Sequence, residues 1–154
     1  VDSTLASKSD RYGLWLSKQA SGWCATRKQV ARIQDLLDDK CPTCQKVVET
    51  SDHLNRCLDS GRTQLFEESV DLLTKWLHQD NRTDPELAYW IPKYLLFRGC
   101  KHFVSMGPMS PSLTRAGASQ DEIGWVELLH GKVSVEIAAI QDTHCRLSTC
   151  QMNG

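Results

Sequence analysis

The sequence predicts an all-α fold for this chain of 154 residues. Apolar residues recur at three- and four-residue spacings in several segments, which is the pattern of one buried helix face. Ser, Thr and Asp residues that can cap a helix precede these segments, and no stretch alternates between apolar and polar residues with a period of two. With 40% hydrophobic residues, the chain has the composition of an ordinary globular domain.

Three helical segments are expected in the first half of the chain. The first has apolar and neutral residues at helical spacings, with Gly22 as the likely break: Tyr12, Trp15, Leu16, Gln19 and Trp23. Thr26 is placed to cap a helix that continues to about residue 37. Residues 41–50 are short, polar and contain a proline, so they are expected to form a loop. Ser51 can then cap a long helix that extends to about residue 79, with Gly61 as a candidate break within it.

Three further helices are expected in the second half. Asp84 followed by proline is typical of a helix start, and Pro92 should end or kink that helix. Residues 105–117 have several Gly, Pro and Ser residues and no apolar period, which predicts a linker or mobile loop. The last two helices are expected to begin at the capping box of Ser119 and Glu122 and at Ser134, and to end at Gly131 and near Leu147.

Four residues have the spacing of a metal site, Cys41-x2-Cys44-x8-His53-x3-Cys57. Two cysteines three residues apart can direct both thiolates inward from one tight turn, and a His and a Cys four apart lie on one helix face. Such a set completes the tetrahedron that structural zinc prefers and leaves no open coordination position. The sequence therefore predicts antiparallel helices around a small irregular CCHC loop that holds one structural Zn²⁺.

Other interpretations of the cysteines are weaker. The four residues could be unrelated neighbours, or Cys41 and Cys44 could form a redox pair, but a redox CxxC normally follows a strand and opens a helix. Cysteine–histidine catalysis would need an orienting group and an oxyanion site that nothing in the sequence supplies. A second metal site is a minor alternative for the remaining candidates, Cys100, His102, His144, Cys145 and Cys150.

The charge distribution suggests one candidate basic face. The net charge of −1 argues against strong non-specific binding to polyanions, yet residues 1–34 contain six Lys and Arg residues against two Asp. An indole among these cations could stack on a nucleobase, whereas Trp15 and Trp76 fall on apolar helix faces and are expected in the core. An ordinary solvated surface remains the alternative. The candidate nucleic-acid-binding residues are Lys18, Trp23, Arg27, Lys28 and Arg32.

Three stretches resemble the C-terminal region of LINE-like (non-LTR) retrotransposon reverse transcriptases. They are residues 11–18 (RYGLWLSK), the CPTC to HLNRC stretch, and residues 122–134 (EIGWVELLHGKVS). In that family a CCHC zinc knuckle follows the polymerase domain and helps to hold RNA or a DNA target, and the resemblance makes Cys41, Cys44, His53 and Cys57 the zinc ligands. The polymerase aspartate motif is absent, and residues 137–139 are Ile-Ala-Ala where the family has Trp and basic residues.

We therefore expect a non-catalytic, zinc-binding accessory domain that assists binding of single-stranded RNA or DNA. The alternative is a zinc-nucleated helical domain for protein interactions, which the acidic middle of the chain favours. An enzyme remains an option only if one ligand does not bind the metal. No small-molecule substrate or membrane partner is indicated, and the polar N-terminus lacks the features of a signal peptide, which suggests a nuclear or cytoplasmic location. The initial Val suggests a fragment or a processed chain.

The expected organisation has three parts. Residues 1–104 form a zinc-stabilised helical domain with the zinc loop at 41–57. Residues 105–118 are the linker or mobile loop, and residues 119–154 form a C-terminal helical segment that packs on the same domain.

Overall fold

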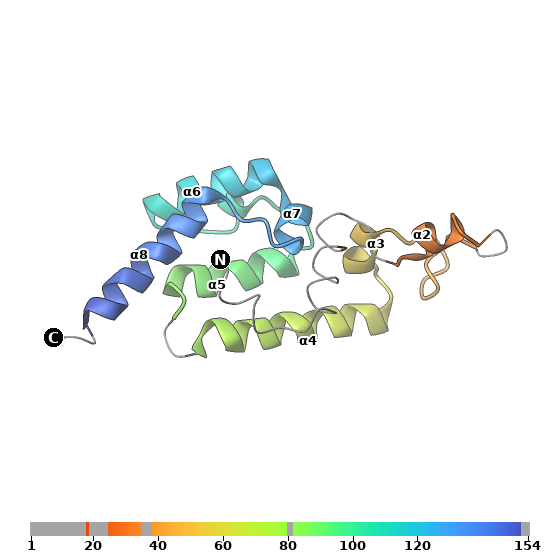
Figure 1. Cartoon of the computed structure of the whole chain (residues 1–154), viewed down its shortest axis with the longest axis horizontal. Coiled ribbons are helices and arrows are strands. Elements are labelled where there is room, and N and C mark those ends of the chain that lie inside the picture. The colour runs from red at the N-terminus through yellow and green to blue at the C-terminus, as the bar shows by residue number, and fades with distance from the viewer. Residues whose placement is uncertain (1–17, 19–24, 35–37, 80–81, 152–154) are drawn as a thin grey trace. The chain divides into compact units, whose positions relative to one another are not determined.

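The computed structural model describes residues 18, 25–34, 38–79 and 82–151 (Figure 1). The chain divides into two compact units, residues 1–63 and 64–154. The described residues form α-helices, one short 3-10 helix and a single isolated bridge between Lys40 and Val48, with no strand among them, so the predicted all-α class is confirmed. None of the described helices combines the length and the apolar character needed to cross a bilayer.

The first unit contains two short helices, α2 (Arg27–Ala31) and α3 (Ser51–Arg56). The helix expected from Thr26 to about residue 37 is much shorter than predicted, since α2 ends at Ala31. None of its residues is buried, and Ile33 beyond its end is exposed, so no packed apolar face extends it. Thr50 rather than Ser51 caps α3, with its hydroxyl accepting from the His53 amide at 3.0 Å.

The long helix expected from Ser51 onward is interrupted, but not at Gly61. Cys57 leaves α3 in an extended conformation, and α4 (Ser60–Leu77) begins three residues later. Asp59 Oδ1 accepts from the amides of Gly61 and Arg62 at 3.0 and 3.2 Å, as an N-cap does. Gly61 therefore lies inside the first turn of α4, and the break belongs to the Cys57–Asp59 corner.

The second unit contains most of α4 and all later helices. The elements after α4 are α5 (Pro85–Leu96), the 3-10 helix η2 (Phe103–Ser105), α6 (Pro111–Ile123), α7 (Trp125–Leu129) and α8 (Val135–Gln151). Helix α6 is central to their packing, because it contacts η2, α7 and α8. The two compact units divide within α4, and residues 105–118 belong to the second unit.

Helix α5 begins as expected but does not stop at its internal proline. Asp84 Oδ1 accepts from the amides of Glu86 and Leu87, at 3.0 and 3.2 Å, and the proline after Asp84 occupies the first turn. Pro92 lies inside the helix and is buried. The buried side chains around it, Trp90 and Tyr94, anchor the helix in the core, so packing outweighs the hydrogen bond that proline removes.

Residues 105–118 were expected to be a linker or mobile loop, and this prediction was wrong. Ser110 Oγ accepts from the Leu113 amide at 3.3 Å, and Pro111 follows as the first helical residue of α6. The helix buries Leu113, Ala116, Gly117 and Gln120, a face of small residues with few strong apolar markers. The expected capping box at Ser119 is also wrong, since Ser119 lies within α6 and donates to a backbone carbonyl. Gly124, at φ +98°, separates α6 from α7.

The core lies in the second unit and is closed by close packing of α6 against η2. A Cβ atom on Gly117 would lie 2.7 Å from Phe103 Cδ1, so only glycine permits this approach. Asp121 accepts from the amides of Phe103 and Val104, at 2.6 and 3.2 Å, and this fixes η2. The buried core residues are Leu87, Trp90, Tyr94, Phe103, Leu113, Ala116, Trp125 and Ile137.

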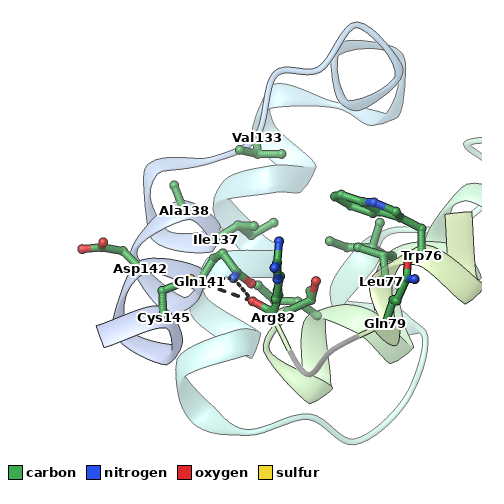
Figure 2. A pocket seen from close by; sticks show the side chains of 13 residues that line it. Trp76, Leu77, Gln79, Arg82, Val133, Ile137, Ala138, Gln141, Asp142 and Cys145 are labelled. Atoms are coloured by element: carbon green, nitrogen blue, oxygen red, sulfur yellow. Dashed lines mark hydrogen bonds between the residues drawn. The ribbon is translucent and has the colours of Figure 1, made fainter. Parts of the chain in front are cut away.

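Buried polar contacts attach α8 to the rest of the unit. Gln120 is fully buried and accepts from the Ser134 amide at 2.8 Å. Ser134 Oγ accepts from the Ile137 amide at 3.2 Å and so caps α8 as predicted, although the helix continues to Gln151. Further along α8, Gln141 Nε2 donates to the Arg82 carbonyl at 2.7 Å (Figure 2).

Two glycine substitutions should have opposite effects on stability. Gly117→Ala forces a clash with Phe103 and should lower the free energy of unfolding by about 1–3 kcal/mol. Gly61→Ala should raise it by about 0.5 kcal/mol, because its Cβ would meet only Asp59 Oδ1 at 3.4 Å and alanine favours a helix. Chemical denaturation measures both, and a stabilised Gly117→Ala would contradict the packing described.

Candidate metal centre

The first two cysteines lie on a tight turn that backbone hydrogen bonds close on both sides. The Cys41 amide donates to the Val47 carbonyl at 2.7 Å, and the Gln45 amide donates to the Cys41 carbonyl at 2.9 Å. Gln45 has a φ of +56°, the left-handed conformation that such a turn requires. Cys41 is fully buried and Cys44 is half-buried, so the turn holds two thiols on its inner side.

The other two candidate ligands are presented by α3. His53 lies in its first turn, and Cys57 follows four residues later at the C-terminal end. Residues four apart lie above one another on a helix, so the imidazole and the thiol face the same way. Cys57 is 1% exposed, and the turn to extended backbone at this residue directs the chain away toward α4.

The four ligand atoms meet in one place. The sulfur atoms of Cys41, Cys44 and Cys57 and a ring nitrogen of His53 all lie within 4.8 Å of one another, and Cys44 Sγ is 3.4 Å from His53 Nε2. A tetrahedral zinc site with bonds of about 2.0–2.3 Å has ligand-to-ligand distances of roughly 3.5–3.8 Å. The observed grouping is compatible with one zinc ion, and three thiols with an imidazole are a donor set that zinc favours.

Electrostatics within the cluster favour a bound cation. Burial acts to raise the pKa of the Cys41 thiol, but hydrogen bonds from the Cys44 and Thr43 amides, from His53 and from the Thr43 side chain bring it down to about 6. Burial raises the pKa of Cys57, and the neighbouring thiols of Cys44 and Cys41 raise it further. One thiolate is therefore stabilised by the backbone, whereas additional thiolates need a positive charge beside them.

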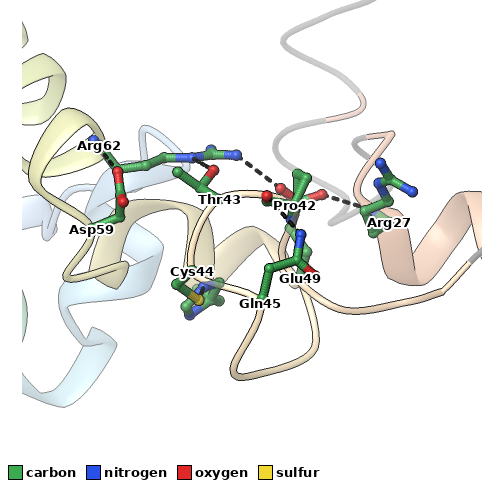
Figure 3. A network of polar contacts seen from close by, with 9 residues as sticks. Arg27, Pro42, Thr43, Cys44, Gln45, Glu49, Asp59 and Arg62 are labelled. Atoms are coloured by element: carbon green, nitrogen blue, oxygen red, sulfur yellow. Dashed lines mark hydrogen bonds and ion pairs between the residues drawn. The ribbon is translucent and has the colours of Figure 1, made fainter.

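A buried carboxylate connects the surroundings of the cluster (Figure 3). Glu49 is 6% exposed; its Oε1 accepts from Arg62 Nη2 at 3.0 Å, and its Oε2 accepts from the Arg27 amide at 2.8 Å. Arg62 Nε also donates to Thr43 Oγ1, at 2.9 Å, within the cysteine turn. Glu49 and Arg62 thus join the start of α2, the cysteine turn and the start of α4 within the first unit.

The sequence did not reveal this network. Glu49 follows two valines in the segment 45–50 and could have been noted as an isolated acid beside apolar residues. Its partners, however, are 13 and 22 residues away, and neither spacing is a helical one. Only the closed cysteine turn brings these groups together.

The candidate nucleic-acid-binding residues differ in their exposure to solvent. Lys18, Lys28 and Arg32 are exposed and Arg27 is half-buried, whereas Trp23 lies outside the described residues. Lys28 and Arg32 are four residues apart and therefore share one side of α2, although Arg32 at its end also donates to Gln29 at 3.1 Å. The amide of Arg27 donates to Glu49 Oε2 at 2.8 Å.

Several other predicted features differ from the structure. Trp76 was expected in the core but is 65% exposed, and Trp15 lies outside the described residues. Cys100 and Cys145 are exposed, and His102 lies 3.8 Å from Asp121. Within the described ranges only the Cys41 cluster gathers three or more potential metal ligands, so no second site appears there.

Removing the buried carboxylate should destabilise the first unit. Glu49→Ala leaves Arg62 and the Arg27 amide without their partner and should lower the free energy of unfolding by about 2 kcal/mol. Glu68→Ala is the control, because that carboxylate is exposed and accepts a hydrogen bond from Gln64 one turn away; its effect should stay within about 0.5 kcal/mol. Equal effects of the two substitutions in urea denaturation would refute the role given to Glu49.

Comparison of the chain with protein families, with curated proteins and with solved structures found no match.

Proposed function

We propose that the chain is a non-catalytic zinc-binding module in which Cys41, Cys44, His53 and Cys57 hold one structural Zn²⁺. The composition of the first unit's interior is the observation that carries this proposal. Among its described residues, the buried side chains are Thr26, Cys41, Glu49 and Cys57, with no aliphatic or aromatic residue. Residues 25–34 and 38–63 therefore gain little from apolar burial among themselves, and metal binding can supply about 10 kcal/mol or more.

The ligand set favours a structural role for the metal. Four protein donors fill a tetrahedral zinc ion, so no coordination position remains for a water nucleophile or a substrate. When bound, the ion would cross-link the cysteine turn to α3 and neutralise the thiolates. The Glu49–Arg62 contacts would then extend this cross-link to α2 and α4.

We further propose that the zinc module binds single-stranded nucleic acid, and two local features support this. A cavity of 490 Å³ lies beside Cys44 and His53, and its other lining residues include Lys46, Arg56, Leu58 and Asp59. Arg56 also pairs with Asp52 at 3.1 Å. Leu58 is 88% exposed and Val47, which also lines the cavity, is 48% exposed, so the cavity presents apolar surface to solvent. Cations beside an exposed apolar surface suit a chain of alternating phosphates and bases, and Lys28 and Arg32 would add contacts from α2.

Zinc content tests the first part of the proposal. Purified protein should contain one Zn²⁺ per chain, Cys57→Ser should lose it, and Cys100→Ser should retain it, because Cys100 is exposed and outside the cluster. Elemental analysis by mass spectrometry gives the stoichiometry. Chelation should unfold residues 25–63 and leave the second unit intact, since its core contains no ligand. Zinc-free protein with unchanged amide NMR signals in residues 25–63 would overturn the proposal.

The same site should show a defined pH dependence. Above pH 6 the Cys41 thiol is already ionised, whereas below pH 6 zinc must displace a further proton from it. The apparent zinc affinity should therefore fall more steeply with acidification below about pH 6 than it does just above that value. Competition with a chromogenic chelator at a series of pH values measures the slope.

Nucleic-acid binding is tested by fluorescence anisotropy with a labelled single-stranded oligonucleotide at about 50 mM salt. The double substitution Lys28→Glu and Lys46→Glu should weaken binding about tenfold and reduce the slope of log affinity against log salt by about 1.4, at about 0.7 per lost phosphate contact. Arg115→Glu, on the exposed side of α6, should have little effect. If zinc-loaded protein binds no RNA or DNA oligonucleotide, the alternative of a protein-interaction domain is favoured instead.

A further inference from the structure

The second unit contains a cavity that is separate from the candidate metal centre in the first unit. It has a volume of 710 Å³ and lies between the end of α4, residues 82–83, α5 and α8 (Figure 2). Its walls are mainly apolar and include Leu77, Leu87, Ile91 and Ile137. This volume is within the range of about 300–1,000 Å³ found for small-molecule sites.

One cation points into this apolar cavity. Figure 2 shows the Arg82 side chain extending between α8 and the end of α4. The Arg82 backbone is held in place, because Gln141 Nε2 donates to its carbonyl at 2.7 Å and Gln141 Oε1 accepts from the Asp84 amide at 3.0 Å. Within the described part of the chain, no hydrogen bond or ion pair occupies the Arg82 guanidinium, so it is available to a ligand.

The charged residues that line the cavity favour an anionic ligand over a cationic one. Arg82 is the one cation and Asp142 the one anion among the described lining residues. The Asp142 carboxylate points away from the cavity in Figure 2 and pairs with Arg146 at 2.6 Å. The Arg82 guanidinium is exposed at the mouth of the apolar cavity, with no carboxylate from the lining residues turned toward it, and a singly charged carboxylate can accept two parallel hydrogen bonds from it.

The rim of the cavity also exposes apolar surface to solvent. Trp76 is 65% exposed and Val133 is 43% exposed, and both line the opening. A ligand with an apolar body would cover this surface and gain about 25 cal/mol for each Å² removed from water. A purely ionic ligand would leave it exposed.

We propose that this cavity binds a small amphiphilic molecule with an apolar chain or ring and a single carboxylate, which Arg82 pairs with while the walls enclose the apolar part. The site is independent of the zinc module, since none of its lining residues belongs to the first unit. Failure of either proposal therefore leaves the other standing.

The test uses decanoate and decanamide, which have the same chain and differ in the charge of the head group. The full-length protein should bind decanoate about fivefold more tightly than decanamide in isothermal titration calorimetry, and salt should reduce this preference. Arg82→Gln should bring the two affinities together by weakening decanoate alone. Arg115→Gln, an exposed arginine outside the cavity, is the matched control and should preserve the preference.

A second variant tests the location of binding without altering charge. Ala138 lines the cavity from the exposed side of α8, so Ala138→Phe should fill the space and reduce the affinity for both ligands at least fivefold, with the fold retained. Methyl NMR signals of Ile91 and Ile137 should shift on titration in the wild-type chain only. The proposal is overturned if decanoate does not bind the wild-type chain, if decanamide binds equally well, or if Ala138→Phe binds decanoate unchanged.

Discussion

The polar character of the interior formed by residues 25–34 and 38–63 is the constraint that shapes the described part of the first unit. Its buried described residues are thiols, a hydroxyl and a carboxylate, so ordinary hydrophobic burial contributes little to holding α2 and α3 in place. The cysteine cluster occupies the position that a core would take, and it is electrostatically incomplete, because ionising Cys57 beside Cys41 and Cys44 is unfavourable. A bound divalent cation would relieve this repulsion and supply cross-links. The hydrogen bonds of Glu49 with the Arg27 amide and with Arg62 would then connect the metal site to α2 and α4, which contain no metal ligand.

The second unit is stabilised by an apolar core, and buried polar side chains support that core. Asp121 holds η2 through two amides, and the Tyr94 hydroxyl lies 3.4 Å from the same carboxylate. Burial together with this carboxylate raises the pKa of Tyr94 to about 12, so the phenol remains a neutral donor at physiological pH. Gln120 similarly satisfies the backbone where α8 begins. These polar contacts specify which surfaces meet, while the apolar residues supply most of the burial.

The grouping of the four residues could be predicted from sequence because its geometry is local: a tight turn determines the positions of Cys41 and Cys44, and one helix face those of His53 and Cys57. The all-α class followed from periodicity for the same reason. Prediction failed where small residues rather than large apolar ones form the packed face, as in α6, where Ser110 and Pro111 start a helix instead of marking a loop. It also failed at Trp76, since an apolar stripe identifies a helix face but not whether another element covers it.

The attachment of α8 is uneven along its length. Ser134 caps its first turn, Ile137 is buried in the core, and Gln141 donates a hydrogen bond to the Arg82 carbonyl. Leu147, near the end of the helix, is 64% exposed. Opening of the final turns breaks few tertiary contacts, while opening of the first turns requires the core to come apart. Amide hydrogens should therefore exchange with solvent quickly beyond residue 145 and slowly before residue 141. The helix would fray as two segments, and its last turns could be lost without unfolding the unit.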